Sequence, residues 1–132
     1  MRQSGFALIS AVFLVVVLSL LGAMIVSLST TQQIGQVRDL FGSQAYFAAR
    51  TGIEWGAHRV IQSGSCAAST TLPALSGSAA NFTVQVTCTA SAPVNEAGVD
   101  VTVYQITATA TRGTLGSHDH AERQLEAVVS LP

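Results

Sequence analysis

The densest group of side chains able to bind a metal ion lies near the C-terminal end of the chain, at His118, Asp119, His120 and Glu122. Imidazole and carboxylate groups are ligands for divalent metals, and the two histidines project to the same side if their segment is extended. The segment also follows Gly113 and Gly116, which are typical of a turn. We therefore expect a polar connecting loop here and no metal site.

No other set of residues typical of catalysis occurs in the sequence. There is no Gly-x-Ser-x-Gly motif, no glycine-rich phosphate loop before a helix, and no pair of carboxylates in an apolar setting. The net charge is -1 and the six basic residues, all arginine, are scattered. Nucleic-acid binding needs clustered cations that displace counterions, so we exclude it. We expect no enzyme, no catalytic residue and no cofactor.

The two cysteines, Cys66 and Cys88, both follow the apolar N-terminal part of the chain. An even number of cysteines in a small exported domain indicates one disulfide. Two independent buried thiols are the alternative. The spacing contains no Cys-x-x-Cys pair, which argues against a metal site.

A long apolar segment begins close to the N-terminus. Residues from Phe6 to Leu28 include no charged side chain and are numerous enough to span a bilayer as a helix. Arg2 precedes the segment, so the positive-inside rule places this end in the cytoplasm. A secretory signal peptide has a shorter apolar core. That alternative and a plain signal anchor are the two less favoured interpretations of this segment.

The helical pattern continues beyond the apolar segment to about Ser63. A stripe at helical spacing contains Ile34, Val37, Phe41, Ala45, Ala48, Gly52 and Trp55. Its small residues predict a flat surface on which a sheet packs closely, with Trp55 and Tyr46 as larger anchors. Gly52 and Gly56 could instead form a Gly-x-x-x-Gly helix dimerisation motif.

The second half of the chain predicts strands. Residues 64–80 read as a loop, residues 81–90 alternate as a half-buried strand, and residues 91–98 read as a turn. Strands over 99–112 and 121–131 follow; in the first, the alternation slips between Val103 and Tyr104, which indicates a bulge. The expected fold is α+β, with one long helix on a small antiparallel sheet of about three strands.

The N-terminal residues resemble a known signature. Gly5 followed by Phe-Ala-Leu-Ile and an apolar helix is similar to the type IV prepilin signature. The resemblance implies that residues 1–5 are a leader, that prepilin peptidase cuts between Gly5 and Phe6, and that Phe6 becomes N-methylated. In major pilins the fifth mature residue is a glutamate that pairs with a neighbour's amino terminus. Here that position is Ser10, which implies a minor pilin and not a shaft subunit.

Residues 38–57 narrow the resemblance. Their Arg-Asp-x-x-Gly-x-x-Ala-aromatic run and the Glu54-Trp55 pair are similar to MshP-type proteins of MSHA pilus biogenesis. PilX-type minor pilins and GspK-type pseudopilins begin similarly. The implied layout is a leader over 1–5, a transmembrane and assembly segment over 6–28 and an amphipathic extension of the same helix over 29–63. A periplasmic β head over 64–132 follows, together with the C-terminal half of the helix.

The resemblance also implies partners and a location. The expected function is that of a minor pilin-like subunit in the biogenesis of a type IV, MSHA-like pilus. Its partners would be other pilins through the N-terminal helix, prepilin peptidase, the inner-membrane assembly platform and the lipid bilayer, with no nucleic acid. The chain would cross the bacterial inner membrane once with its head in the periplasm, and entry into an extracellular pilus is a further expectation. The alternatives are a type II secretion minor pseudopilin and an unprocessed single-pass periplasmic binding protein.

Overall fold

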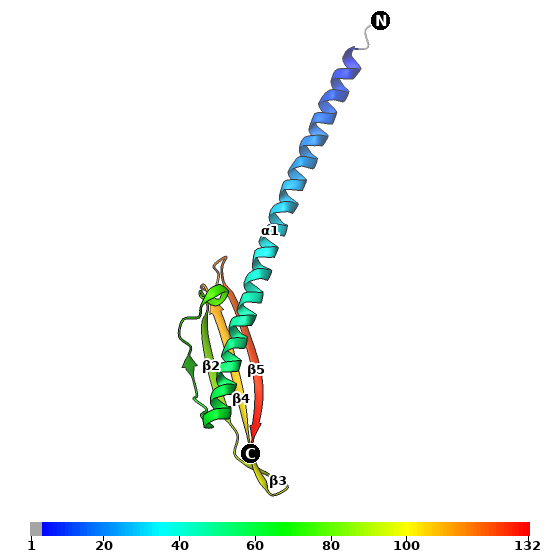
Figure 1. The fold of residues 1–132 in the computed structure, drawn as a ribbon. Helices are drawn as coiled ribbons and strands as arrows, with labels where there is room; N and C mark the ends of the chain where they lie inside the picture. Colours follow the sequence, from blue (N-terminus) through cyan, green and yellow to red (C-terminus); the bar gives the residue numbers. More distant parts are fainter. Residues whose placement is uncertain (1–3) are drawn as a thin grey trace. The chain divides into compact units, whose positions relative to one another are not determined.

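The computed structural model describes the backbone of residues 4–132 and side chains from Phe6 onward (Figure 1). The expected leader, residues 1–5, therefore lies largely outside the described part. The chain divides into two compact units, one ending at Val37 and one comprising Arg38–Pro132, which we call the head. Each unit is described separately below.

One helix, α1, occupies Ser4–Ser63 and contributes to both units. It contains no proline, and the first proline of the chain is Pro73. The helix ends at Gly64, which adopts a positive φ of 59° and donates its backbone N–H to the Val60 carbonyl oxygen at 2.9 Å. A glycine in this conformation is a common way to end a helix. The predicted end near Ser63 is confirmed.

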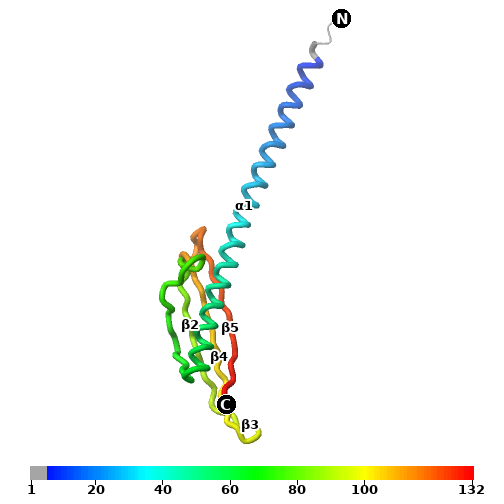
Figure 2. Tube along the Cα trace, viewed as in Figure 1, coloured from blue at the N-terminus to red at the C-terminus, as the bar shows by residue number. Residues whose placement is uncertain are grey.

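The head contains an antiparallel sheet of five strands (Figures 1 and 2). The strands are β1 Thr70–Thr71, β2 Thr83–Ala90, β3 Val94–Glu96, β4 Val99–Arg112 and β5 Ala121–Leu131, with a 3₁₀ turn, η1, at Gly77–Ala79. β4 is central: residues 104–111 pair with β2, and residues 102–112 pair with β5. The predicted α+β fold is confirmed.

The sheet has two more strands than the expected three. β1 and β3 contribute only two and three residues, too few for a detectable alternation of side chains. β3 pairs with the first residues of β4 across a two-residue turn in which Ala97 and Gly98 have φ of 52° and 92°. Two consecutive positive φ values are typical of a tight hairpin turn. The predicted turn over 91–98 is thus a β-hairpin arm.

The predicted bulge at Val103 and Tyr104 is wrong. The register of β4 with β5 runs without interruption from Thr102↔Leu131 to Arg112↔Ala121. The apolar residues shift from odd-numbered to even-numbered positions because only the later part of β4 has one face covered by the helix. From Tyr104 onward the even-numbered residues face the helix, whereas Val99 and Val103 lie on the exposed side.

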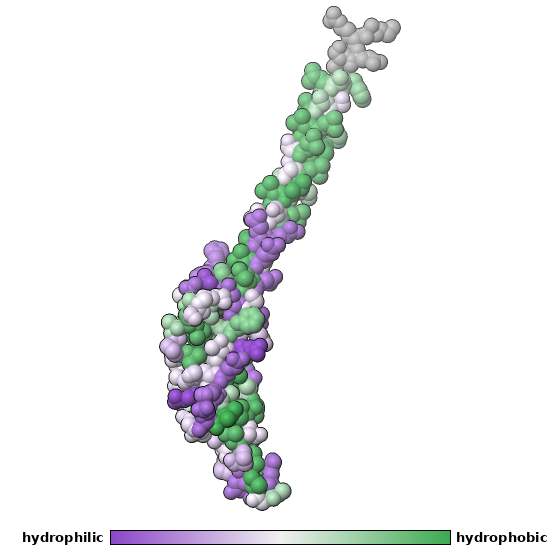
Figure 3. Space-filling view, in the orientation of Figure 1, coloured by the Kyte–Doolittle hydropathy of each residue, from purple (hydrophilic) through white to green (hydrophobic). Residues whose placement is uncertain are grey.

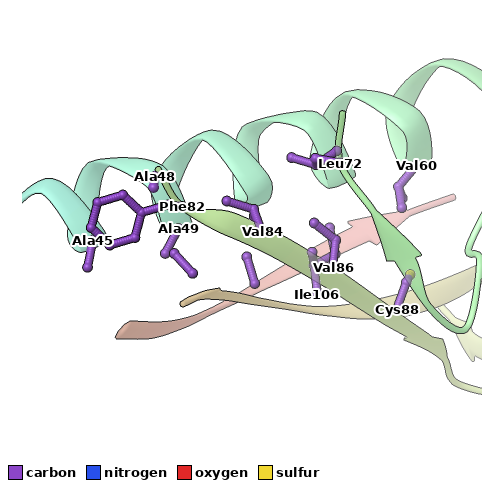
Figure 4. Close-up of a cluster of buried hydrophobic side chains, with 12 residues drawn as sticks. Ala45, Ala48, Ala49, Val60, Leu72, Phe82, Val84, Val86, Cys88 and Ile106 are labelled. Atoms are coloured by element: carbon purple, nitrogen blue, oxygen red, sulfur yellow. The ribbon is translucent and has the colours of Figure 1, made fainter. Parts of the chain in front are cut away.

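Helix α1 and the sheet pack through a core of small and branched side chains (Figure 4). The helix contributes Ala45, Ala48, Ala49 and Val60, and the sheet contributes Phe82, Val84, Val86, Ile106, Ala108 and Ala110. Gly52 and Gly56 allow the close approach: a Cβ at either position would lie 2.8 Å from a side-chain carbon of the sheet. Both glycines are buried against the sheet, which confirms the packing interpretation over helix dimerisation.

The larger anchors were predicted only in part. Trp55 is half-buried against the core, with the Arg59 guanidinium 5.2 Å from its ring centroid. Tyr46 is 44% exposed and is not an anchor. Its position on the helix turns it toward the side of the head where β5 lies, away from the centre of the buried stripe.

Candidate functional site

The N-terminal part of α1 exposes its apolar side chains, and Figure 3 shows those on one face. Exposed fractions run from 81% at Phe6 to 65% at Leu28, with Val16 and Leu21 at 51%. By length and composition this helix can cross a membrane. Apolar surface of this extent is unstable in water, so the segment needs lipid or other apolar helices around it.

Ser10 lies within this apolar segment and satisfies its own hydroxyl. The Ser10 Oγ is 3.1 Å from the carbonyl oxygens of both Phe6 and Ala7. The hydroxyl can therefore donate within the helix and needs no partner from outside. A glutamate at this position would instead bring a carboxylate into an apolar environment, which costs about 2 to 3 kcal/mol or more when unpaired.

The cysteines form the predicted disulfide. Cys66 and Cys88 are joined in the head, with their Cα atoms 5.2 Å apart. Cys88 lies on the buried face of β2, and Cys66 lies in the segment that follows α1. The bond therefore ties the end of the helix to the sheet. The alternative of two independent thiols is excluded.

The histidine-rich segment is a loop, as predicted. Residues 113–120 form turns between β4 and β5, with φ of 68° at Gly113 and 91° at Gly116. Among residues 4–132, no group of three or more His, Cys, Asp or Glu side chains is arranged to bind a metal. Hydrogen bonding to Ser117 and to its own backbone lowers the pKa of the Asp119 carboxyl, and the charges of Arg112 and His120 act in the same direction.

Two neighbouring grooves in the head were not predicted. One, of about 300 Å³, lies by the loop and is bordered by Arg38, His118, His120 and Arg123. The other, of about 730 Å³, lies between α1 and β5 and is bordered by Tyr46, Phe47 and Leu125. The sequence gives little indication of either groove. The residues that border them come from segments far apart in the chain, and none of them forms a motif.

The face of the sheet opposite α1 is rich in hydroxyl and amide groups. Its residues are Thr83, Gln85, Thr87 and Thr89 of β2 and Gln105, Thr107, Thr109 and Thr111 of β4, which lie opposite one another in the register. They are exposed or half-buried. Threonine pairs across strands stabilise a sheet, so this face has a structural role independent of any ligand.

The only ion pair among the described residues joins Arg50 and Glu54, whose Nε and Oε1 atoms are 2.9 Å apart. Both side chains are exposed, at 59% and 65%. A pair of this kind stabilises a helix by a few tenths of a kcal/mol, about 0.3 to 0.5. No polar or charged residue in the described part of the chain is fully buried.

Comparisons with protein-family profiles, with curated proteins and with solved structures find no match for this chain.

Proposed function

We propose that this chain is a minor type IV pilin-like subunit that takes part in the assembly of an MSHA-like pilus. The observation that carries the proposal is the combination of an apolar helical segment with a small disulfide-bonded α+β head on one continuous helix. The Gly5-Phe6 junction at the start of that helix supplies the expected site of processing. The bacterial inner membrane is the proposed location, with the head in the periplasm.

The mechanism of assembly is physical. In a membrane the apolar side chains between Phe6 and Leu28 contact lipid, and in a fibre they contact the same segments of neighbouring subunits. Both environments are apolar, so transfer between them changes the burial of apolar surface little. The exposure of these side chains around the whole helix supports such a role, because the segment has neighbours to gain on every side.

Ser10 supports a minor position within the assembly. A glutamate that pairs with a neighbour's amino terminus supplies a charge-assisted hydrogen bond, and Ser10 cannot supply one. Its hydroxyl is already within hydrogen-bond distance of two carbonyl oxygens of its own helix. The subunit therefore suits a rare place such as the tip or an initiating complex.

The intact mass of the mature chain tests the proposal. We expect loss of residues 1–5 and the addition of one methyl group at Phe6. The Gly5→Val variant should keep its leader, because a Cβ at Gly5 hinders the close approach of a peptidase to an extended backbone. The control Ser4→Ala should be processed like the original chain.

Retention of residues 1–5 in the unmodified chain would contradict the proposal and favour an unprocessed single-pass protein.

A photo-crosslinker at Leu14 distinguishes a type IV pilus from a type II secretion system. Crosslinks to pilins of a surface fibre support a pilus subunit, whereas crosslinks to pseudopilins of a secretion system point to the alternative machine.

A further inference from the structure

The edge of the sheet formed by β5 has no neighbouring strand along the whole length of β5 in the described part of the chain. β5, Ala121–Leu131, pairs with β4 on one side, and within residues 4–132 no strand pairs with its other side. Open edges usually carry a proline, a bulge or charges that block pairing with another chain. β5 has charges at Glu122, Arg123 and Glu126, but residues 127–131 contain none, and the register with β4 is uninterrupted.

The hydrogen bonds of the head show which backbone groups point to this edge. Val84 accepts a hydrogen bond from the Leu72 N–H at 2.9 Å, so the backbone groups of Val84 point away from β4. In an antiparallel ladder its partner Ala110 then points to β5, where it pairs with Arg123. Alternation along β5 turns the N–H and C=O groups of the even-numbered residues outward.

A second hydrogen bond gives the same assignment. The Val103 carbonyl oxygen accepts from the Ser91 N–H at 2.8 Å, which turns Val103 away from β5. Its partner in β5 is Ser130, whose groups must therefore point outward. The outward-pointing residues are Glu122, Gln124, Glu126, Val128 and Ser130.

An apolar surface runs beside this edge. Leu125, Ala127, Val129 and Leu131 face α1 but are only half-buried. Next to the start of β5 lies the groove of about 730 Å³, which the aromatic side chains of Tyr46 and Phe47 border together with charged side chains, Arg38, Asp39 and Arg123. Phe47 is 58% exposed, and its ring meets that of Tyr46 edge-on at 5.6 Å. A strand added to β5 would cover these side chains.

We propose that β5 is a docking site for an extended segment of another exported protein, which adds as a further strand of the sheet. The segment has apolar side chains at alternate positions, beside the half-buried apolar residues of β5 between Leu125 and Leu131. It has basic side chains on the other face, where β5 presents Glu122 and Glu126. Opposite charges at facing positions of neighbouring strands stabilise the pair. This inference goes beyond the proposed function and rests on it only for the location of the head outside the cytoplasm.

A second copy of this chain fits the edge poorly. β5 runs beside the helix of the head in the same sense (Figure 1), so antiparallel pairing of two β5 strands would make the two helices run in opposite directions. On the face away from α1, β5 carries Glu122 and Glu126 and no cation, so antiparallel pairing of two copies would also bring carboxylates together. Parallel pairing about a two-fold axis along the strands would turn Glu126 of one copy toward the half-buried Leu125 and Ala127 of the other.

The test uses the full chain in a neutral detergent and three capped nine-residue peptides. One alternates valine and lysine, one alternates valine and glutamate, and one has the valine-lysine composition in two blocks. We expect the alternating valine-lysine peptide to bind at least about tenfold more tightly than the other two, because it alone combines alternation with opposite charge. Hydrogen exchange should then slow at the even-numbered amides of β5, while the odd-numbered amides are protected with or without peptide.

Two proline variants make a matched pair. Val128→Pro removes an outward N–H and spares the ladder with β4, so we expect a folded head that no longer binds the peptide. Val129→Pro removes an N–H that bonds to β4, so we expect a less stable head. Glu126→Lys should remain folded and lose most of the preference for the valine-lysine peptide, because Glu122 and the new lysine then offset one another.

Three results would overturn the proposal. The first is that none of the peptides binds. The second is that Val128→Pro binds as well as the original chain, or that protection appears outside β5. The third is that the even-numbered amides become protected without peptide as the protein concentration rises, which would identify a second copy as the occupant.

Discussion

At the scale of single residues, the packing of the head depends on glycines, which have no Cβ atom. A Cβ at Gly52 would lie 2.8 Å from Ala108 Cβ and from Val84 Cγ1, closer than real side chains come. Alanine is the better helix former by about 1 kcal/mol, so helix propensity alone favours its substitution for this glycine. The steric contact opposes that preference, because both neighbouring side chains are buried.

We therefore expect Gly52→Ala to lower the free energy of unfolding of the head by about 1 to 3 kcal/mol. Gly42→Ala is the matched control on the same helix. Its Cβ would meet only the flexible end of Arg123, at 3.8 Å, so it should leave stability unchanged or raise it by up to about 1 kcal/mol. Denaturant unfolding followed by circular dichroism measures both; equal effects of the two variants would show that packing at Gly52 is not tight.

At the scale of elements, the disulfide joins the segment after α1 to the buried face of β2. Cys66 and Cys88 are 22 residues apart, and closing a loop of that size stabilises a folded protein by about 3 kcal/mol. We expect the double variant Cys66→Ala, Cys88→Ala to unfold at correspondingly lower denaturant concentration. A reducing agent should destabilise the original chain and leave the double variant unaffected, and a reductant effect on both would assign the change to something else.

The long elements were predictable from the sequence because each has a long pattern. α1, β2, β4 and β5 were located to within a few residues, since period and alternation persist over eight residues or more. The short strands β1 and β3 were missed because two or three residues carry no period. The false prediction of a bulge in β4 has a different cause. Alternation reports which face of a strand is covered, and it does not report whether the backbone is regular.

The candidate sites also include some that the sequence predicted and some that it did not. Cysteine number and exported context predicted the disulfide, and glycines predicted the loop over 113–120. The groove beside β5 could not be predicted, because it depends on where Tyr46 and Phe47 lie relative to Leu125, residues almost eighty positions apart. The open edge at β5 follows from the strand order, which depends on pairings that the alternation of a single strand does not report.

At the scale of the whole molecule, the two units are suited to different environments, the head to water and the N-terminal segment to an apolar medium. The head from Arg38 to Pro132 buries its own apolar core, whereas the apolar side chains from Phe6 to Leu28 are exposed. We expect a chain that begins at Arg38 to be water-soluble and to keep the helix and sheet content of the head. The full chain should partition into the detergent phase.

Phase separation in a nonionic detergent, with circular dichroism of each fraction, makes this comparison. Aggregation of the shortened chain would contradict the expectation and show that the head needs the preceding segment. A matched control is the shortened chain carrying Gly52→Ala, which should be soluble but less stable. This separates a loss of solubility from a loss of packing.

The strand order also bears on the speed of folding. β2, β4 and β5 pair with their neighbours in sequence, with β3 inserted as a hairpin arm between β2 and β4, so the sheet forms without a crossover connection. Pairings between segments close in sequence form quickly, because little chain entropy is lost in closing each loop. The contacts of α1 with β4 span more residues and involve a helix surface of alanine and glycine. The contacts between α1 and β4 should therefore form late in folding, so a variant such as Gly52→Ala should mainly speed unfolding and change the rate of refolding little.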